Sequence, residues 1–356
     1  MSGITPHSQY SVSYSIVIRT LGNTGNKYKA LLDSIKAQTI QPEEVIVVIP
    51  EDCTLDHTLG YETIIHSPKG MVSQRAAGIE YAKSENILVV DDDLEFGADF
   101  VECLACYQKV HHLDCVLPKE GMPTQDSDTT INLFYPLLTR IKYAFTGRMF
   151  QTKRASRYID IITVTAGHKM FCGCNQLDSC YYSQTGNFQC FFINTNKAKQ
   201  VDFNKEVWLQ QGLLYSYASY DDATFFYHFY LQGYSIAYSL RARYRHLDAA
   251  AGRPAKDKVE TKRIRSYCIS RNRTVFWYRF LYQPSNSISR KLYVILGGLY
   301  AFINYTLFTI LINILPNYWP VISAMFQGYH EAFSIIKQGD LPPHGLVFRK
   351  DGKKVS

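Results

Sequence analysis

The first third of the chain alternates short, continuously apolar runs with segments of helical periodicity. Four apolar runs cover residues 14–19, 45–49, 64–65 and 87–90. Apolar residues at helical spacing mark the segments 28–37, 71–82 and 100–107. Strands without polar alternation are buried on both faces, which is typical of a parallel sheet covered by helices. We therefore expect a doubly wound α/β domain, with ligands gathering at the carboxyl ends of the strands.

Composition and charge narrow the class of protein. Hydrophobic residues make up 46% of the 356 residues and charged residues 19%, which indicates a globular chain. The segment after the first strand, residues 19–23, reads RTLGN and lacks the GxGxxG pattern of dinucleotide-binding oxidoreductases. The net charge of +7 gathers around residues 137–157 and 241–279. Such stripes suit a phosphate-bearing ligand or an anionic membrane surface, or are solvated faces; we expect no nucleic-acid partner.

The cysteines and the N-terminal residues bear on the compartment. The chain has nine cysteines, an odd number, and residues 1–10 are polar rather than apolar like a signal peptide. We therefore expect a reducing, cytosolic environment. Cys103 and Cys106 lie three apart on an expected helix and have no matching second pair. Buried thiols are favoured for them and for a second group without metal-site spacing, which comprises His168, Cys172, Cys174 and Cys180.

Beyond residue 118 the pattern is less regular. Residues 119–183 contain a polar linker and a basic aromatic stretch, and we expect acceptor choice to reside in this insert. Segments with the pattern of strands cover residues 158–165, 188–193 and 235–240. Helices are expected after Asp222 and over residues 263–282, the second of them basic and aromatic.

A long uncharged segment lies near the C-terminal end. From Leu292 to Tyr329 there is no Asp, Glu, Lys, Arg or His, and residues 293–315 are mostly apolar. At ~1.5 Å per residue this length can span a bilayer. Basic residues flank it on both sides, so the charges do not place the flanks on opposite faces. We expect a helix in the membrane interface or a re-entrant turn; a single span is the second interpretation, and a buried soluble helix the third.

Three consecutive aspartates, Asp91, Asp92 and Asp93, directly follow the apolar run 87–90. Acids placed this closely repel one another and need a counter-charge, and a hard divalent cation with oxygen ligands supplies one. Residues two apart on an extended segment face the same side, so Asp91 and Asp93 can reach one ligand together. A solvated acidic turn is the alternative.

Two further features can carry chemistry. Asp221 and Asp222 open an expected helix, where carboxylates either cap the first turn or accept a proton from an attacking hydroxyl. His246 ends a strand-like segment among Arg241, Arg243 and Arg245. An isolated histidine is more often structural, but this basic neighbourhood suits a diphosphate and its metal.

Several ordered blocks resemble glycosyltransferase family 2, the inverting GT-A family. The match comprises SIVIRTLGN with LLDSIKAQTIQPEEVIVV, then GMVSQRAAGIEYAKSENILVVDDDLEF, TGNFQCFFIN, YDDATFFYHFYLQGYSIAYSLRARYRH and ISRNRTVFWYRF. These blocks resemble the family's first strands, its arginine-bearing helix with the DxD, the acceptor-side strand, the Glu-Asp helix with the terminal His, and the arginine-asparagine-arginine helix. The separations from Asp222 to Gly233 and from Gly233 to His246 are those expected of the family.

The resemblance implies a role for each matching residue. Asp222 would be the general base, and Asp93 and His246 would hold a divalent cation, Mn²⁺ or Mg²⁺. On the acceptor side the resemblance implies Asn187 and Asp221, the latter standing where the family has Glu. The donor-binding residues that it implies are Thr20, Glu51, Arg75, Asp91 and Asp92. Glu51 belongs to the segment IPED, which replaces the family's Asp-Asp after the second strand.

These inferences combine into one reading of the chain. We expect a GT-A domain over residues 1–282, with a donor half at about 10–118, a variable insert at 119–183 and an acceptor half at about 184–282, followed by a helical tail, 283–356. Its expected function is metal-dependent, inverting sugar transfer from a nucleotide-diphosphate sugar, with a UDP-sugar favoured. The acceptor would be a glycan or lipid-linked, in cell-surface polysaccharide or glycolipid assembly at the inner face of the membrane. The alternatives are a sugar-phosphate nucleotidyltransferase and a degenerate, non-catalytic assembly partner.

Overall fold

A computed structural model describes residues 12–22, 25–121, 158–170, 177, 179–213, 217–247 and 258–339. The N-terminal part contains β1 (Tyr14–Arg19), α1 (Asn26–Lys36), β2 (Glu44–Pro50), β3 (Thr63–Ser67), α2 (Met71–Tyr81), β4 (Asn86–Asp91), β5 (Leu94–Phe96), α3 (Phe100–Val110) and β6 (Cys115–Glu120). The middle part contains β7 (Tyr158–Ile162), β8 (His168–Met170), β9 (Tyr181–Ser183), β10 (Cys190–Asn194), α5 (Thr195–Lys199), the 3-10 helix η2 (Phe203–Gln210), α6 (Asp221–Leu231) and β11 (Ile236–His246). The C-terminal helices are α7 (Lys258–Trp277), the π-helical η3 (Tyr278–Tyr282), α8 (Ile288–Ile312), the 3-10 helix η4 (Pro316–Tyr318) and α9 (Trp319–Gln338).

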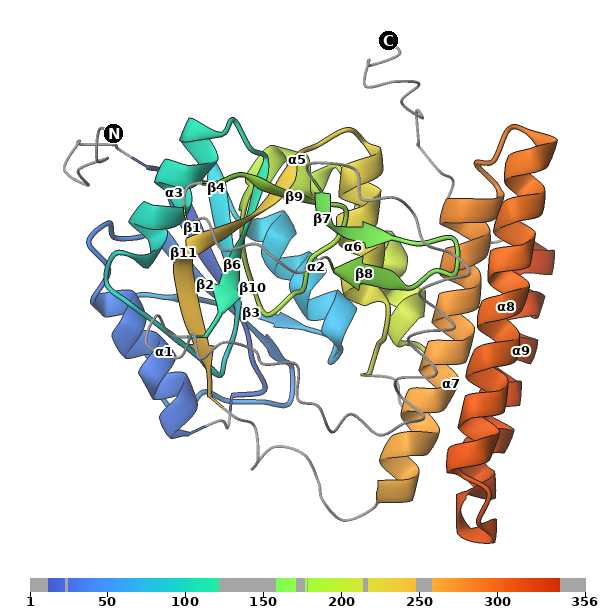
Figure 1. Ribbon diagram of the computed structural model, residues 1–356. Coiled ribbons are helices and arrows are strands. Elements are labelled where there is room, and N and C mark those ends of the chain that lie inside the picture. Colours follow the sequence, from blue (N-terminus) through green and yellow to red (C-terminus); the bar gives the residue numbers. More distant parts are fainter. Residues whose placement is uncertain are drawn as a thin grey trace, which may run out of the picture.

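One sheet runs through the molecule, in the order β3-β2-β1-β4-β10-β6-β11-β9-β7-β8, with β5 paired to β11 (Figure 1). The strands β3, β2, β1 and β4 are parallel, as their continuous apolar runs predict. Their carboxyl ends therefore lie at one edge of the sheet. The register pairs Arg19 with Asp91, which brings the end of β1 beside the first of the three aspartates.

The second half of the sheet is mixed rather than parallel. β10 lies between β4 and β6 and is antiparallel to both. β9 and β5 are antiparallel to β11, whereas β6 is parallel to it. The sequence predicts a mostly parallel sheet because a buried apolar strand has the same composition in either direction. The α/β fold is confirmed. The expectation of a mostly parallel sheet is corrected beyond β4, where the strand directions are mixed.

Helices cover both faces of the sheet, as expected. One core cluster joins the sheet to α1 and α3, and the other joins it to α2, η2 and α6. α2 lies very close to the strands because Gly78 leaves room for Val17: a Cβ at Gly78 would be 2.3 Å from Val17 Cγ1. A larger residue there would push α2 from the sheet, and with it the side chains that α2 presents to the strand ends.

The helices α7, α8 and α9 stand beside the sheet domain (Figure 1). α7 packs along α9, and Gly328 of α9 allows a close approach, since a Cβ there would be 2.5 Å from Tyr267 O. Arg279 of η3 forms an ion pair with Glu206 of η2, with an N–O distance of 2.6 Å, and both side chains are 1% exposed. The helix expected over residues 263–282 therefore joins the sheet domain to the C-terminal helices.

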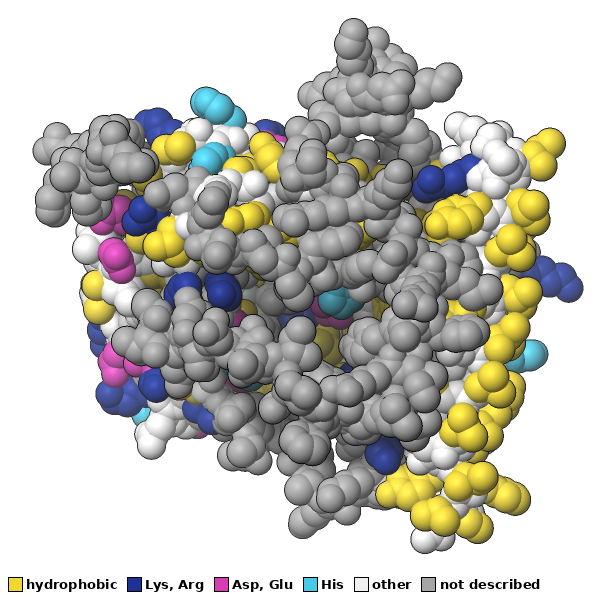
Figure 2. Space-filling view, in the orientation of Figure 1, with side chains coloured by type: hydrophobic (Ala, Val, Ile, Leu, Met, Phe, Trp, Pro, Cys, Tyr) yellow, Lys and Arg dark blue, Asp and Glu magenta, His cyan; other side chains and the backbone are white. Residues whose placement is uncertain are grey.

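The apolar segment forms α8, and α8 has two different sides. Val294, Gly297 and Ala301 are buried, whereas Leu299 is 53% exposed and Leu311 is 66% exposed. Hydrophobic side chains gather along the edge of the molecule that α8 and α9 form (Figure 2). Among the described residues, α8 is the one helix long and apolar enough to cross a membrane.

Some expectations fall outside the described residues. They concern the polar linker, the basic stretch 137–157, Cys172, Cys174 and residues 340–356. Of the cysteines that the structure describes, Cys103, Cys106 and Cys180 form no disulfide and are half-buried, so the expectation of buried thiols is wrong for these three. Residues 158–170 of the expected insert form the hairpin of β7 and β8.

Candidate active site

Two arginines surround the first of the three aspartates. Asp91 ends β4, and Arg19 Nε, from the paired strand β1, lies 3.1 Å from Asp91 Oδ1. Arg75 NH2, from α2, lies 3.2 Å from the same oxygen. Burial acts to raise the pKa of Asp91, but the two guanidinium groups hold that pKa below its ordinary value. Asp91 is therefore an ionised carboxylate whose charge the protein itself compensates.

Arg75, which contacts Asp91, also contacts the helix α6. Its NH1 lies 2.8 Å from Asp221 Oδ2, and its guanidinium lies over the Phe188 ring, 4.5 Å from the centroid. Arg75 is 3% exposed and Asp221 5% exposed. One buried guanidinium thus joins the end of β4 to the first turn of α6, so the Asp221 side chain forms an ion pair where helix capping was the alternative.

A side-chain amide fixes the start of the helix that carries Arg75. The side-chain Oε1 of Gln210 accepts hydrogen bonds from the backbone N–H groups of Val72, at 2.8 Å, and Ser73, at 3.1 Å. These are donors that a helix start leaves without an intrahelical partner. Gln74 of the same turn donates to Thr20 O and to Val48 O, which ties α2 to the ends of β1 and β2.

The second aspartate is held by the first loop. Thr20 Oγ1 donates to Asp92 Oδ2 at 2.5 Å and accepts a hydrogen bond from the N–H of Gly22 at 2.9 Å. Thr20 is 1% exposed and Asp92 8% exposed. Burial raises the pKa of Asp92. The structure therefore brings together Thr20 and Asp92, two of the donor-binding residues that the resemblance implies.

The third aspartate meets the histidine that ends β11. Asp93 Oδ2 lies 3.2 Å from His246 Nε2, although 153 residues separate the two in sequence. The N–H of Leu247 donates to Asp93 O at 2.7 Å, and β11 pairs with β5 directly after the aspartates. Burial raises the pKa of Asp93, and the charge of His246 acts to lower it. The expected convergence of these two side chains is observed.

The Asp93 and His246 pair fits the donor set of a divalent cation. Ligands bound at about 2.1 Å and at right angles lie about 3 Å from each other, close to the observed contact. A carboxylate oxygen with an imidazole nitrogen suits Mn²⁺ better than Mg²⁺, which prefers oxygen ligands. Among the described residues no group of three His, Cys, Asp or Glu side chains could hold a metal.

Asp222 follows Asp221 in the first turn of α6. Its Oδ1 accepts a hydrogen bond from the N–H of Ala223 at 2.7 Å. Burial and the adjacent Asp221 carboxylate raise the pKa of Asp222 to about 6, although Arg75 and His168 act to lower it. A carboxyl group that titrates near neutral pH can take a proton from a substrate and release it again.

Two predicted site residues lie at the margin of this arrangement. Asn187 is next to Phe188, and its Oδ1 accepts a hydrogen bond from the N–H of Gln189 at 3.2 Å. Glu51 is exposed in the turn after β2, and none of the interactions described above for the site includes it. The structure therefore brings Asn187 to the edge of the site and leaves Glu51 facing solvent.

Sequence reasoning missed three groups at the site. Arg19, whose guanidinium contacts Asp91, was not among the predicted site residues, and a cation at the end of the strand paired to β4 was the available signal. Gln189 accepts the N–H of Asp91 with its backbone oxygen, at 2.9 Å, and the hydroxyl of Tyr244 with its side chain. His168 was assigned to a structural cluster, but its side chain is 68% exposed and faces Asp160.

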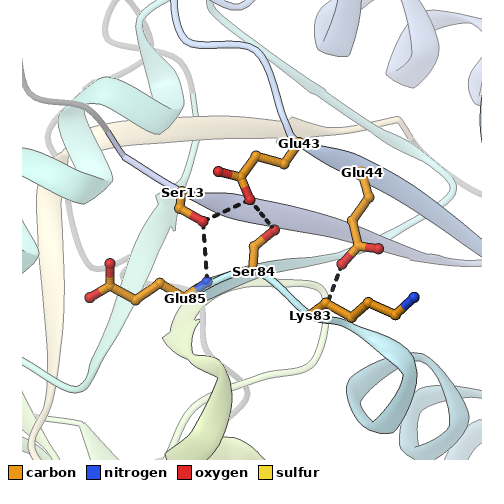
Figure 3. Close-up of a pocket in the computed structure, with 6 residues that line it drawn as sticks. All are labelled: Ser13, Glu43, Glu44, Lys83, Ser84 and Glu85. Atoms are coloured by element: carbon orange, nitrogen blue, oxygen red, sulfur yellow. Dashed lines mark hydrogen bonds between the residues drawn. The ribbon is translucent and has the colours of Figure 1, made fainter.

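A cavity of about 270 Å³ lies at the opposite edge of the sheet, where the strands begin. Its lining residues are Ser13, Glu43, Glu44, Lys83, Ser84 and Glu85 (Figure 3). Ser13 and Ser84 both donate to Glu43 Oε2 at 2.8 Å, and the N–H of Lys83 donates to Glu44 Oε1 at 2.7 Å. These lining residues form hydrogen bonds with one another at the starts of the strands. The cavity therefore lies apart from the aspartates, which follow the strand ends.

Three solved structures are similar to the chain at low sequence identity. The chain is similar to the mannosyltransferase PcManGT from Pyrobaculum calidifontis in complex with GDP-Man and Mn²⁺, with TM-score 0.46, 10% identity, and coverage of 95% of this chain and 82% of that one. It is similar to S. aureus TarS 1-349, with TM-score 0.41, 15% identity, and coverage of 96% and 98%. It is also similar to GalNAc-T7 with UDP, GalNAc and Mn²⁺, with TM-score 0.44, 12% identity, and coverage of 87% and 59%.

The family comparison concerns the part of the chain that carries the aspartates. A search of curated proteins gave no match. Residues 15–155 match the model of glycosyl transferase family 2. This range includes β1 to β6, the three aspartates and Arg75, and the α/β sheet observed there is the one expected of a GT-A domain. Residues 15–155 of the chain are therefore similar to glycosyl transferase family 2.

Proposed function

We propose that the chain is a metal-dependent, inverting glycosyltransferase that moves a sugar from a nucleotide-diphosphate donor, with a UDP-sugar favoured, onto an acceptor hydroxyl. The observation that supports this most is the bridge that Arg75 forms from Asp91 to Asp221. The bridge fixes the aspartates of the donor side relative to the helix that presents Asp222. A donor and an acceptor held on either side of Arg75 would meet in one orientation, which is a large part of catalysis.

The reaction that fits this arrangement is a single displacement at the anomeric carbon. As the acceptor oxygen forms its bond to that carbon, its proton passes to Asp222. The bond from the carbon to the diphosphate oxygen breaks, and its electron pair stays on the diphosphate. A cation held by Asp93 and His246 would neutralise that charge. Attack opposite the leaving group inverts the configuration of the carbon.

The paired charges explain how the donor is held before the reaction. Because Arg19 and Arg75 keep Asp91 ionised, Asp91 can accept hydrogen bonds from the ribose or uracil side of the donor. A hydrogen bond from Thr20 to Asp92 fixes the loop that follows β1 beside the aspartates. These side chains already have partners within the protein, so we expect donor binding to require little rearrangement.

The test is the substitution Asp222→Asn in the full chain. We expect sugar transfer to fall by about 10²–10⁴-fold, because the base is lost, while nucleotide-sugar binding stays unchanged. Asp33→Asn, at an exposed position of α1, is the matched control and should retain activity. Turnover by Asp222→Asn equal to that of the wild type would remove Asp222 from this role. Assays of pyrophosphate exchange with a sugar 1-phosphate separate the nucleotidyltransferase alternative, and a non-catalytic partner would show neither reaction.

The surface of α8 suggests where in the cell the protein acts and which class of acceptor it uses. Its outer side is apolar, with Leu299 53% and Leu307 55% exposed, while Gly297 packs against Val164 on the inner side. Arg290 and Lys291, at the start of α8, are exposed and suit anionic headgroups. A helix that packs on protein along one side and is apolar on the other fits an interfacial position better than a span. We infer a glycan or lipid-linked acceptor at the inner membrane face, in surface polysaccharide or glycolipid assembly.

Flotation with lipid vesicles tests this placement. The full chain should float with vesicles that contain anionic lipid, and the double substitution Leu299→Glu with Leu307→Glu should abolish flotation because it buries two charges in the apolar layer. Val110→Glu, at a 53% exposed position of α3, is the matched control and should float like the wild type. Equal flotation of all three proteins would contradict a role for α8.

A further inference from the structure

A second titratable pair lies beside Asp222, on the hairpin of β7 and β8. His168 Nδ1 lies 3.4 Å from Asp160 Oδ1. In the register of the hairpin, Ile162 is opposite His168 and Asp160 is opposite Met170. Residues two apart on a strand share a face, so Asp160 and His168 are diagonal neighbours on one face of the hairpin. The hairpin therefore holds a carboxylate and an imidazole together.

The two members of the pair have opposite exposure. Asp160 is 2% exposed, whereas the side chain of His168 is 68% exposed. Asp160 Oδ1 is buried and has no hydrogen-bond partner among the described residues, and His168 Nδ1 lies 3.4 Å from it. A buried carboxylate in a folded protein normally has a partner. The imidazole faces this oxygen through Nδ1, and among the described residues no hydrogen bond of the Nε2 edge is seen, so this edge can contact another molecule.

The turn before His168 is fixed against the start of α6. Tyr220 donates its hydroxyl hydrogen to Ala166 O at 2.9 Å, and Arg273 of α7 donates to Thr165 O from Nε and NH2 at 3.1 and 2.6 Å. Tyr220 and Ala166 each lie two residues before a member of the site, Asp222 and His168 respectively. These bonds hold the imidazole and the base on two segments that are fastened to each other.

The charges around the two groups agree with this proximity. The charged groups that act on Asp222 among the described residues are Asp221, Arg75 and His168. Those that act on His168 are Asp160 and Asp222, and Asp160 raises the pKa of His168 most. Asp222 and Asp160 also act together on the hydroxyl of Tyr238. His168 is thus the cation on the hairpin side of Asp222, as Arg75 is on the donor side.

We propose that Asp160 and His168 form a positioning pair for Asp222: buried Asp160 fixes the imidazole, and the solvent-facing edge of the imidazole orients the attacking oxygen of the acceptor against the Asp222 carboxylate. This proposal rests on the proposed function. The oxygen is that of a sugar hydroxyl or, without an acceptor, of water. While it is protonated, His168 also keeps Asp222 ionised, which favours proton transfer from the oxygen to Asp222.

The test uses the full chain with Mn²⁺ and a UDP-sugar that it hydrolyses, so that water is the acceptor. His168→Gln should lower kcat by about tenfold with an unchanged donor KM, since an attacking oxygen out of place costs rate and not donor affinity. The acid limb of its pH profile should move to higher pH, because the positive neighbour of Asp222 is gone. Asp160→Asn should move the limb in the same direction. His168→Lys should return it towards the wild-type position.

His66→Gln, at an exposed histidine of β3, is the matched control and should leave kcat and the pH profile unchanged. An unchanged kcat and acid limb in His168→Gln would overturn the pair's role while the proposed function stands. A higher donor KM with an unshifted limb would also overturn it, because that result indicates a structural role. A wild-type protein that neither binds nor hydrolyses any nucleotide sugar would overturn the proposed function, and the pair's role with it. Because the His168 side chain is exposed, we expect His168→Gln to fold. This variant therefore still tests the proposal if Asp160→Asn does not fold.

Discussion

The pKa values of the carboxylates on the two sides of the site are shifted in opposite directions. On the donor side, Asp91 lies within ion-pair distance of both Arg19 and Arg75, which hold its pKa below the ordinary value. On the acceptor side, burial and Asp221 raise the pKa of Asp222 to about 6. The residue types are the same, and the environments differ.

The difference indicates a division of work between the two sides. A carboxylate that stays ionised at every physiological pH can bind a ligand but cannot exchange protons usefully. A carboxylate that titrates near neutral pH can do so, and pairs of acids with diverging pKa values mark acid and base roles. Arg75 contacts both sides, so it is the residue on which the contrast depends most.

The largest expected effect follows from Arg75→Met. This change leaves Asp91 with one partner and the buried Asp221 with none, and breaking a buried pair in this way costs about 3–5 kcal/mol of unfolding free energy. The matched control, Arg263→Met, breaks a half-buried pair with Glu260 within one helix, α7, and should cost about 1 kcal/mol or less. Urea unfolding at pH 7 measures both, and equal costs would show that the bridge has no structural weight.

The second-largest effect is expected in the pH dependence of the free energy of unfolding. Folding raises the pKa of Asp222 from 3.8 to about 6, so the folded state favours the protonated form. Ionised Asp222 therefore costs stability, a cost that appears as pH rises from about 4 to 6 and persists above. We expect Asp222→Asn to be more stable than the wild type by about 1–3 kcal/mol at pH 8, with the gain absent below pH 4. A pH-independent difference in urea unfolding would contradict this.

The same carboxylate should set the acid limb of catalysis. Turnover requires ionised Asp222, so kcat for donor hydrolysis should fall about tenfold for each pH unit below about 6. A pH–rate profile of the wild type measures this limb. A flat profile down to pH 4 would show that Asp222 is not the base.

The smallest effect is expected at Thr20. Thr20→Val removes the hydroxyl that donates to buried Asp92 and should cost about 1–2 kcal/mol. Thr39→Val removes an exposed hydrogen bond to Glu102 and serves as the control, with a cost of about 0.5 kcal/mol or less. Thermal or urea unfolding compares the two, and a Thr20 cost no larger than that of Thr39 would show that the loop does not depend on Asp92.

Local patterns predicted much of the donor side. The apolar runs that become β1, β2 and β4 have boundaries that differ from the expected ones by a residue or less. Parallel pairing then places the ends of β1 and β4 together, so the aspartates at a strand edge follow from the sequence. The convergence of Asp93 and His246 was expected only from the resemblance to the family, because no local pattern relates residues so far apart in the chain.

The acceptor side was less predictable for physical reasons. β10 has the composition of a buried strand in either direction, so its antiparallel insertion beside β4 leaves no trace in hydrophobicity. The bridge from Arg75 to Asp221 spans 146 residues and depends on how α2 and α6 pack. His168 was grouped with nearby cysteines by sequence distance, whereas its partner Asp160 is set by the register of a hairpin.

We propose above all that Asp93 and His246 hold a cation that binds the donor's diphosphate. The most direct measurement is thermal unfolding of the wild type and of Asp93→Asn with UDP-sugars and with or without Mn²⁺, using Asp33→Asn as the control. We expect a UDP-sugar to stabilise the wild type and the control only when Mn²⁺ is present, and Asp93→Asn to lose this gain. Equal stabilisation of Asp93→Asn, or none in the wild type with any nucleotide sugar, would contradict it.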